Sequence, residues 1–119
     1  MIEERTAEIE LAPERVKALL AGGEADLVDV RRDYEWEAGR IRGARRIEMN
    51  DLRANADSIA RDQPIVFYCR TGNRSEMAAA AFRDAGYDAY NLAGGIQAWA
   101  DAGLPLDPDG GEVAPPRAE

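Results

Sequence analysis

Short hydrophobic runs and helix-like hydrophobic spacings alternate along the chain. Buried strands are predicted by apolar runs at residues 26–30, 65–68 and 88–92, and a short edge strand by apolar and polar residues in alternation at 8–11. A further strand is expected at 45–48. Apolar residues three or four positions apart predict helices between them, at residues 13–21, 33–38, 50–60, 76–85 and 96–100. Strands that alternate with helices predict an α/β domain with a mostly parallel sheet.

Cap and turn residues mark the ends of several predicted helices. Pro13 suits the first turn of the first helix, which should end at the glycines 22 and 23. Asn50 is expected to cap the helix at 50–60. The helix that begins near residue 76 should end at Gly86. One of its faces is expected to be apolar, formed by Met77, Ala78, Ala81, Phe82 and Ala85.

The folded part of the chain is expected to be one domain over residues 8–106. A chain of 119 residues with 45% hydrophobic and 32% charged residues is long enough for a core and typical of a globular protein. Residues 1–7 are mostly polar and are expected to be a flexible N-terminus. Residues 107–119 are rich in proline, glycine and acidic residues, which predicts a disordered C-terminal tail.

Charge and missing residue types exclude several classes of function. The net charge of −8 argues against nucleic acid and anionic membranes as partners. No apolar segment approaches the length of a membrane span, and a single cysteine cannot form an internal disulfide, so we expect a reducing cytoplasm. The absence of histidine excludes Ser-His-Asp and Cys-His catalysis and zinc sites that need imidazole. We therefore expect no metal and no cofactor.

One segment combines a nucleophile with an anion-binding loop. The only cysteine, Cys69, follows the strongest predicted strand and precedes a helix. Backbone N–H groups of such a loop converge on negative charge, and both they and the helix dipole favour thiolate over thiol. We assign Cys69 as the candidate catalytic nucleophile. The candidate substrate-binding loop consists of Arg70, Thr71, Gly72, Asn73, Arg74 and Ser75.

Other interpretations of these residues stay open at the level of sequence. Cys69 could pack as a small buried hydrophobe, although the loop favours a reactive thiol. Ser75 could cap the helix or contact the sulfur, and at least one of Arg70 and Arg74 is expected to clamp the loop. Elsewhere, Arg31 is expected to pair with Glu35. A further cluster is expected to be a solvated face or, alternatively, to steer anions toward the cleft; it consists of Arg40, Arg42, Arg45 and Arg46.

Four segments, in this order, resemble the rhodanese family of sulfurtransferases in its single-domain form. They are LVDVR at 27–31, YEWEAGRIRGA at 34–44, CRTGNRS at 69–75 and NLAGGIQAW at 91–99. The similarity extends from about residue 9 to residue 106, with Arg40 and Arg42 where the family often has histidine and proline. The resemblance implies a rhodanese-like three-layer α/β/α domain around a mostly parallel five-stranded sheet.

The resemblance also implies a sulfur relay. The Cys69 thiolate would take sulfur from a small anionic donor, thiosulfate or a low-molecular-weight persulfide, and pass it to cyanide, a thiol or a protein acceptor. The family pattern suggests that Asp29 is a partner of Arg70, with Asp29 and Arg31 as supporting residues. The implied enzyme is a thiosulfate sulfurtransferase-like transferase.

Two other functions are compatible with parts of this pattern. A sulfur-carrying or protein-binding rhodanese module with little free turnover would share the fold, although the presence of Cys69 favours an enzyme. The related phosphatases and arsenate reductases have five residues between cysteine and arginine, whereas four residues separate Cys69 from Arg74. Tyr68 stands where the phosphatases usually have histidine. The shorter loop favours a sulfur atom over a tetrahedral oxyanion.

Overall fold

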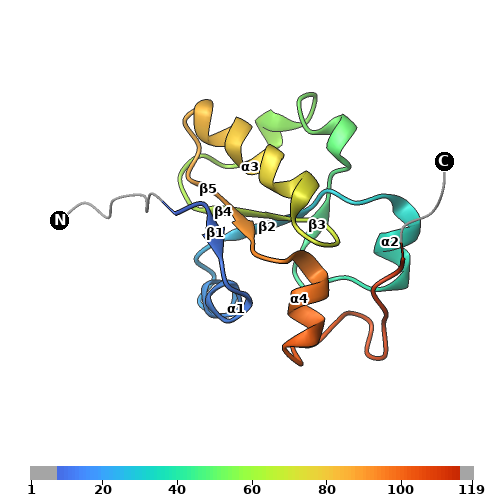
Figure 1. Cartoon of the computed structure of the whole chain (residues 1–119). Coiled ribbons are helices and arrows are strands. Elements are labelled where there is room, and N and C mark those ends of the chain that lie inside the picture. The colour runs from blue at the N-terminus through green and yellow to red at the C-terminus, as the bar shows by residue number, and fades with distance from the viewer. Residues whose placement is uncertain (1–7, 116–119) are drawn as a thin grey trace.

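A sheet of five parallel strands forms the centre of the computed structural model, which describes residues 8–115 (Figure 1). The strand order is β1-β5-β4-β2-β3, and every neighbouring pair is parallel, as the alternating pattern predicts. Along the chain, the elements are β1 (Glu10–Leu11), α1 (Pro13–Ala21), β2 (Asp26–Asp29), α2 (Asp33–Ala38), β3 (Arg45–Arg46), η1 (Met49–Asp51), η2 (Ala56–Ser58), β4 (Ile65–Tyr68), α3 (Asn73–Asp84), β5 (Ala89–Leu92) and α4 (Gly95–Asp101).

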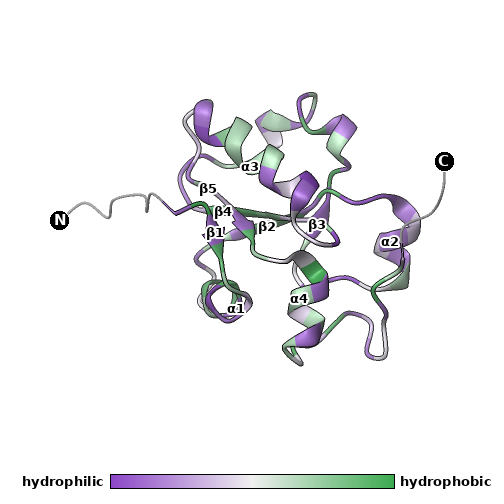
Figure 2. Ribbon diagram, in the orientation of Figure 1, coloured by the Kyte–Doolittle hydropathy of each residue, from purple (hydrophilic) through white to green (hydrophobic). Residues whose placement is uncertain are grey.

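Helices cover both faces of the sheet, because alternate residues of each strand point to opposite sides. On the central strand β4, Ile65 and Phe67 pack on the side of α3, where the ring of Phe82 lies 4.9 Å from that of Phe67. Val66 and Tyr68 pack on the opposite side, against α1 and α4. Figure 2 shows the hydrophobic strands between the two helical layers. Within residues 8–115, none of the helices has both the length and the apolar content to span a bilayer.

The carboxyl ends of β2 and β4 meet at the point where the chain reverses its direction across the sheet. After β2 the chain continues to β3 on one side, and after β4 it continues to β5 on the other. Open parallel sheets bind ligands in the crevice outside such strand ends. Because Arg31 follows β2 and Cys69 follows β4, the fold brings two parts of the predicted site to this crevice.

The expected helix at residues 50–60 is wrong: the chain forms the two short 3-10 helices η1 and η2 there. Small polar side chains compete for the backbone groups that an α-helix would use. The amide of Asn55 donates to the carbonyl of Asp51 at 2.8 Å, and the hydroxyl of Ser58 donates to the carbonyl of Asn55 at 2.7 Å. Leu52 and Ile59 are nevertheless buried against the sheet.

The buried face of α3 also differs from the expected one. Met77 is 67% exposed, and Ala81 and Ala85 are exposed as well, whereas Ala79 is fully buried. Four consecutive alanines at 78–81 offer apolar residues on every side of the helix, so their spacing cannot select one face. The large side chain of Phe82 sets the orientation by packing into the core.

Part of the expected C-terminal tail packs against α2, where Figure 1 shows it as the red segment. The N–H of Asp107 donates to the carbonyl of Arg40 at 2.7 Å, and the N–H of Glu112 donates to that of Ala38 at 2.8 Å. Val113 packs against the buried hydrophobic residues on the α1 and α4 side of the sheet, which include Val66 and Tyr68. The described fold therefore continues past the boundary expected after residue 106. Residues 1–7, expected to be flexible, and residues 116–119 lie outside the described residues.

The N-terminus of α4 contacts the backbone of the predicted loop. The N–H groups of Ile96 and Gln97 donate to the carbonyl oxygens of Cys69 and Arg70, at 2.9 and 3.0 Å. The first amides of a helix lack partners within the helix, and here the loop carbonyls satisfy two of them. Gly95 has a φ of 65°, and a Cβ built on it would lie 2.5 Å from the carbonyl oxygens of Cys69 and Arg70. This close approach requires glycine.

We expect Gly95→Ala to destabilise the protein more than Gly103→Ala does. Both glycines have positive φ, so alanine is strained at either position, by about 1–2 kcal/mol. A Cβ at Gly103 meets nothing within 4 Å, whereas at Gly95 it meets two carbonyl oxygens. We expect the loss of unfolding free energy in urea to exceed that of Gly103→Ala by at least about 1 kcal/mol. Equal losses of unfolding free energy in the two variants would show that the loop carbonyl groups are not tightly packed against Gly95.

Candidate active site

Cys69 lies directly after β4, and its sulfur receives a backbone hydrogen bond. The residue is 1% exposed. The N–H of Gly72 donates to Cys69 Sγ at a distance of 3.1 Å. Gly72 precedes α3 with a φ of 102°, a left-handed conformation that glycine adopts readily. The turn through Gly72 therefore aims a backbone donor at the sulfur.

Ser75 supplies the second polar contact of the sulfur. Its hydroxyl oxygen lies 3.3 Å from Cys69 Sγ, and the residue is fully buried in the first turn of α3. Gly72 occupies the N-cap position of this helix. Of the two sequence-based interpretations of Ser75, the contact with the sulfur is the one present in the structure.

Burial and hydrogen bonding act on the pKa of Cys69 in opposite directions. Burial is the largest effect, and by itself it raises the pKa of the thiol. Hydrogen bonds from the Ser75 side chain and from the backbone N–H groups of Ser75 and Gly72, together with the charge of Arg74, lower it. Their sum places the pKa of Cys69 below its ordinary value. A larger fraction of the sulfur is therefore thiolate at neutral pH than in an ordinary cysteine.

Arg74 clamps the start of α3 to α2. Its Nη1 and Nη2 atoms lie 3.4 and 3.3 Å from Oε1 and Oε2 of Glu35, a residue only 2% exposed. Glu35 Oε1 also accepts the N–H of Arg32 at 3.1 Å, at the beginning of α2. A carboxylate held in this way fixes the guanidinium group beside the loop.

Asp29 and Arg31 pair with each other and not with the partners expected from sequence. Arg31 Nη2 lies 2.8 Å from Asp29 Oδ2, and Arg31 Nε lies 2.9 Å from Asp29 Oδ1, with both side chains fully buried. Asp29 thus pairs with Arg31 in place of the expected Arg70, and Glu35 acts on Arg31 through its charge without the expected direct ion pair. Arg31 is close enough along the chain to fold back onto Asp29, and Glu35 is then available to Arg74.

The buried Arg31 also holds the segment after α2. Its Nη2 donates to the carbonyl of Gly39 at 2.8 Å, and its guanidinium group lies 5.5 Å from the ring centre of Tyr68. The hydroxyl of Tyr68 accepts the N–H of Ile41 at 3.2 Å. The role of Asp29 and Arg31 that these contacts show is to fix the segment around Gly39 to the strand ends.

The remaining loop residues differ in their burial. Thr71 and Asn73 are exposed, whereas Arg70 is partly buried. The Nε atom of Arg70 is enclosed and has no hydrogen-bond partner within residues 8–115. A buried donor without a partner is uncommon in a folded protein. Arg70 is therefore the loop residue with unused capacity to bind a hydrogen-bond acceptor.

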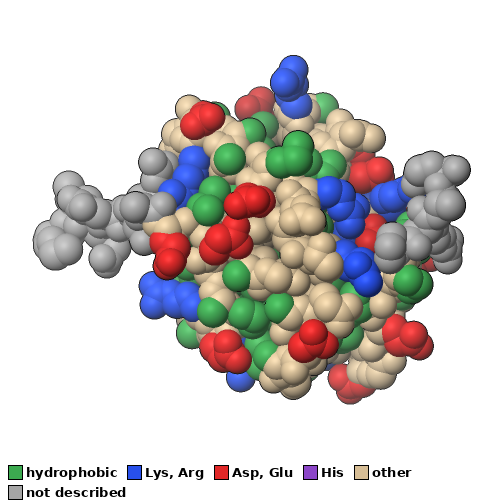
Figure 3. Space-filling model, viewed as in Figure 1, with side chains coloured by type: hydrophobic (Ala, Val, Ile, Leu, Met, Phe, Trp, Pro, Cys, Tyr) green, Lys and Arg blue, Asp and Glu red, His purple; other side chains and the backbone are tan. Residues whose placement is uncertain are grey.

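A cavity of about 410 Å³ opens beside the loop. Its lining includes two basic residues, Arg32 and Arg74, and one acidic residue, Glu48. Figure 3 shows basic side chains gathered on the right of this view, on a chain with a net charge of −8. Sequence reasoning missed Arg32, Glu48, Met49 and Asn50 as cavity residues. Only the position of Arg32, directly after the LVDVR segment, could have drawn attention to it.

Three arginines of the cluster outside the loop have structural contacts. Arg46 pairs with Asp33 and with Glu48, the latter at 3.5 Å. The guanidinium group of Arg40 lies 4.9 Å from the ring centre of Trp36, and Arg45 Nη2 donates to the carbonyl of Ser58 at 2.8 Å. These contacts give Arg40, Arg45 and Arg46 structural roles, which neither the expected solvated face nor anion steering had named.

Fold and site together define an α/β protein with a buried cysteine in a loop whose backbone donates a hydrogen bond to the sulfur. Across the described residues, no group of histidine, cysteine or acidic side chains is arranged to hold a metal ion. Comparison with known proteins shows the family: residues 12–102 match the rhodanese-like domain family. The chain belongs to this family.

One of the similar proteins is named for its activity, and others share the sequence or the fold. Thiosulfate sulfurtransferase GlpE of Pseudomonas aeruginosa is 39% identical over 107 residues, which cover 87% of this chain and 93% of that protein. The uncharacterized protein YqhL of Bacillus subtilis is 41% identical over 76 residues, 63% of this chain and 60% of that protein. A rhodanese-related protein from Thermoplasma volcanium has a similar structure, with a TM-score of 0.76 and 26% identity over 82% of this chain and 95% of that chain. Sulfur transfer is the general activity that these similarities support.

Breaking the buried ion pair should destabilise the fold. We expect Asp29→Asn to lower the free energy of unfolding by about 3 kcal/mol, because the charge of Arg31 would stay buried without its partner. Asp26→Asn, at the half-buried start of the same strand, is the matched control and should cost less than about 1 kcal/mol. Urea unfolding followed by tryptophan fluorescence measures both. A small loss for Asp29→Asn would contradict the assigned role of the pair.

The lowered pKa of Cys69 predicts a shifted pH profile of alkylation. A thiol with a lowered pKa ionises at lower pH, so the rate of reaction with iodoacetamide should have its midpoint below the roughly 8.5 of an ordinary cysteine. The same protein unfolded in urea is the internal control, and its midpoint should return to the ordinary value. Coincident profiles of folded and unfolded protein would show that the loop does not activate the thiol.

Proposed function

We propose that this protein moves a sulfane sulfur atom from thiosulfate or a low-molecular-weight persulfide to a thiol or to cyanide, through a persulfide on Cys69. The observation that supports this most directly is the backbone N–H of Gly72, which donates to Cys69 Sγ at 3.1 Å. Because the chain contains no histidine, this hydrogen bond and the other contacts that lower the pKa of Cys69 take the place of an imidazole base in activating the thiol.

The proposed reaction has two displacement steps. In the first, the Cys69 thiolate attacks the outer sulfur of thiosulfate, a new S–S bond forms, and the old S–S bond breaks with its electron pair leaving on sulfite. In the second, an acceptor thiolate or cyanide attacks the outer sulfur of the persulfide, and the Cys69 thiolate is regenerated. No net proton or electron is required in either step. Such a mechanism gives double-displacement kinetics.

Local charge supports an anionic donor. Arg32 and Arg74 line the cavity beside the loop, although the whole chain is acidic. Arg70 adds a buried Nε donor without a partner among the described residues. Charge-assisted hydrogen bonds from arginine are among the strongest contacts available to an oxyanion such as the sulfonate end of thiosulfate. The near-complete burial of Cys69 favours a small donor over a bulky one.

The contacts of Arg74 argue against a phosphatase or arsenate reductase. Both ends of its guanidinium group already contact the buried carboxylate of Glu35, through Nη1 and Nη2. A phosphatase arginine must give both ends of its guanidinium group to one oxyanion, whereas the guanidinium group of Arg74 can share only its remaining N–H groups with a donor. The loop also has only four residues between Cys69 and Arg74.

We place the proposed activity in the cytoplasm, because a reducing compartment keeps the single thiol available.

Mass spectrometry of the intact protein tests the proposal. Incubation with thiosulfate should add about 32 Da, one sulfur atom, and release an equal amount of sulfite. Cyanide or glutathione should then remove the added mass. Cys69→Ser is the matched control, and it should show no added mass under the same conditions. Failure of thiosulfate and of every persulfide tested to load the protein would overturn the proposal.

Two further measurements separate the competing functions. Saturable turnover with glutathione supports an enzyme, whereas loading by thiosulfate without turnover, and transfer only to one protein partner, would indicate a sulfur-carrying module. Hydrolysis of an aryl phosphate that disappears in Cys69→Ser would support the phosphatase instead. We expect turnover with glutathione and no hydrolysis of the aryl phosphate.

A further inference from the structure

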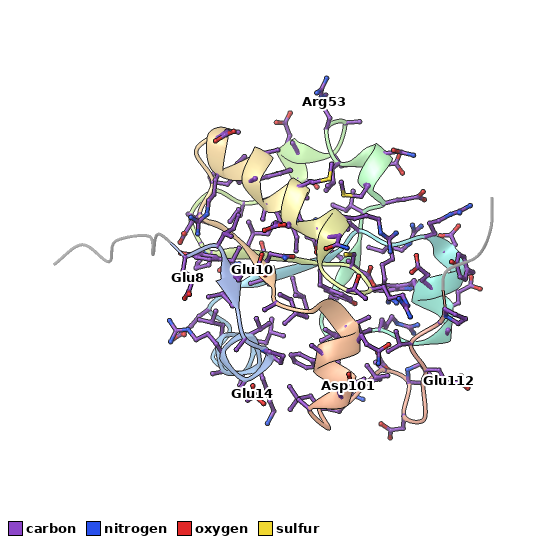
Figure 4. All side chains as sticks on the ribbon, viewed as in Figure 1. Glu8, Glu10, Glu14, Arg53, Asp101 and Glu112 are labelled. Atoms are coloured by element: carbon purple, nitrogen blue, oxygen red, sulfur yellow. The ribbon has the colours of Figure 1, made fainter. Side chains whose placement is uncertain are left out.

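Asn91 connects the hydroxyl partner of the sulfur to a carboxylate on the edge strand. Asn91 belongs to β5 and is 1% exposed. Its Nδ2 atom donates to the carbonyl of Gly72 at 3.1 Å, and to Oε1 and Oε2 of Glu10 at 3.0 and 3.1 Å. Its Oδ1 atom lies 2.5 Å from the hydroxyl oxygen of Ser75, which in turn contacts Cys69. Glu10 extends from β1 (Figure 4).

The oxygen atoms around Nδ2 fix the direction of the Asn91 amide. A reversed amide would place Oδ1 against the carboxylate of Glu10 and the carbonyl of Gly72, and neither can donate a proton while Glu10 is ionised. Oδ1 therefore faces Ser75. An amide oxygen only accepts hydrogen bonds, so this short contact requires the hydroxyl proton of Ser75.

Ser75 has one proton and two acceptors that compete for it. When the proton points to Asn91 Oδ1, the serine oxygen presents a lone pair to Cys69 Sγ at 3.3 Å. A lone pair in this position suits a thiol, whose S–H can donate to it, and repels a thiolate. The Ser75 hydroxyl lowers the pKa of Cys69 only in the other arrangement, in which its proton has turned from Asn91 to the sulfur.

We propose that Asn91, held in orientation by Glu10, is a positioning residue that keeps the proton of Ser75 away from the sulfur of Cys69 and so restrains ionisation of the thiol. The thiolate is then stabilised mainly by the backbone amides of the loop. A persulfide differs, because its negative charge lies on the outer sulfur and Sγ needs no proton from Ser75. The network therefore favours the persulfide over the free thiolate, a consequence that rests on the proposed function.

Charged groups around the network fit this arrangement. Glu76 faces Glu10 from α3, and Arg74 of the same helix acts on Cys69. Burial, and then the repulsion of Glu76, raise the pKa of Glu10, although the hydrogen bond from Asn91 opposes this shift. Glu10 is thus a carboxylate whose charge Asn91 helps to maintain.

A double-mutant cycle on the alkylation profile of Cys69 tests the proposal without any sulfur donor. Asn91→Leu frees the proton of Ser75 for the thiolate, so the midpoint should fall by about one pH unit. In a Ser75→Ala background, Asn91→Leu should leave the midpoint unchanged. An unchanged or raised midpoint with Ser75 present, or equal shifts in both backgrounds, would overturn the proposal. Equal shifts would mean that Asn91 acts through the backbone of Gly72.

Milder substitutions repeat the test if Asn91→Leu fails to fold, which circular dichroism would show. Glu10→Gln removes the charge that orients the amide, and it should lower the midpoint more when Ser75 is present than in the Ser75→Ala background. Glu76→Gln is the matched control, because it removes a neighbouring carboxylate that does not hydrogen-bond to Asn91 in the structure. Its shift should be the same in both backgrounds. A Glu10→Gln shift that is independent of Ser75 would overturn the proposal.

Discussion

The hydrogen bonds from the first amides of α4 to the carbonyl groups of Cys69 and Arg70 are the constraint on which the site depends. With donors at 2.9 and 3.0 Å, they fix the two peptide planes that follow Cys69, and the next turn of chain brings the N–H of Gly72 to the sulfur. The approach is possible only because Gly95 lacks a side chain. A helix that follows β5 thus determines the shape of a loop that follows β4.

This backbone arrangement explains how the pKa of a buried thiol can be lowered. Removal from water disfavours the thiolate of Cys69, and it is the largest effect on the pKa of this group. Hydrogen bonds from the Ser75 hydroxyl and from the backbone N–H groups of Ser75 and Gly72, together with the charge of Arg74, more than offset that effect. The backbone donors need no reorganisation when the charge forms. This chain has no histidine to act as a base beside the thiol. The site therefore depends on a rigid backbone, whose fixed N–H dipoles stabilise the thiolate.

The sequence was sufficient for the strands, the parallel sheet and the position of Cys69 after a strand, because each depends on local hydrophobic spacing or on one loop. It was insufficient at residues 50–60, where two 3-10 helices replace the expected helix. It was also insufficient for the partners of the charged residues. Asp29 and Glu35 each had more than one arginine within plausible reach, and only the folded chain shows that Arg31 folds back onto Asp29. Asn91 stood in a recognised segment, but its role depends on Glu10 from a distant edge strand. Contacts of this kind leave no periodic signal in one sequence.

The two ion pairs near the strand ends, Asp29–Arg31 and Glu35–Arg74, differ in exposure. This difference suits the buried pair to a structural role and the exposed arginine to recognition of the donor. The side chains of Asp29 and Arg31 are both fully buried, so no ligand from solvent can compete for that guanidinium group. The Arg74 side chain is 41% exposed, and its contacts with Glu35 are longer, at 3.3 and 3.4 Å. A long, half-exposed pair leaves guanidinium protons that an anion can share. In the proposed reaction, the charge of the donor is therefore recognised at Arg74, while Arg31 keeps the strand ends in place.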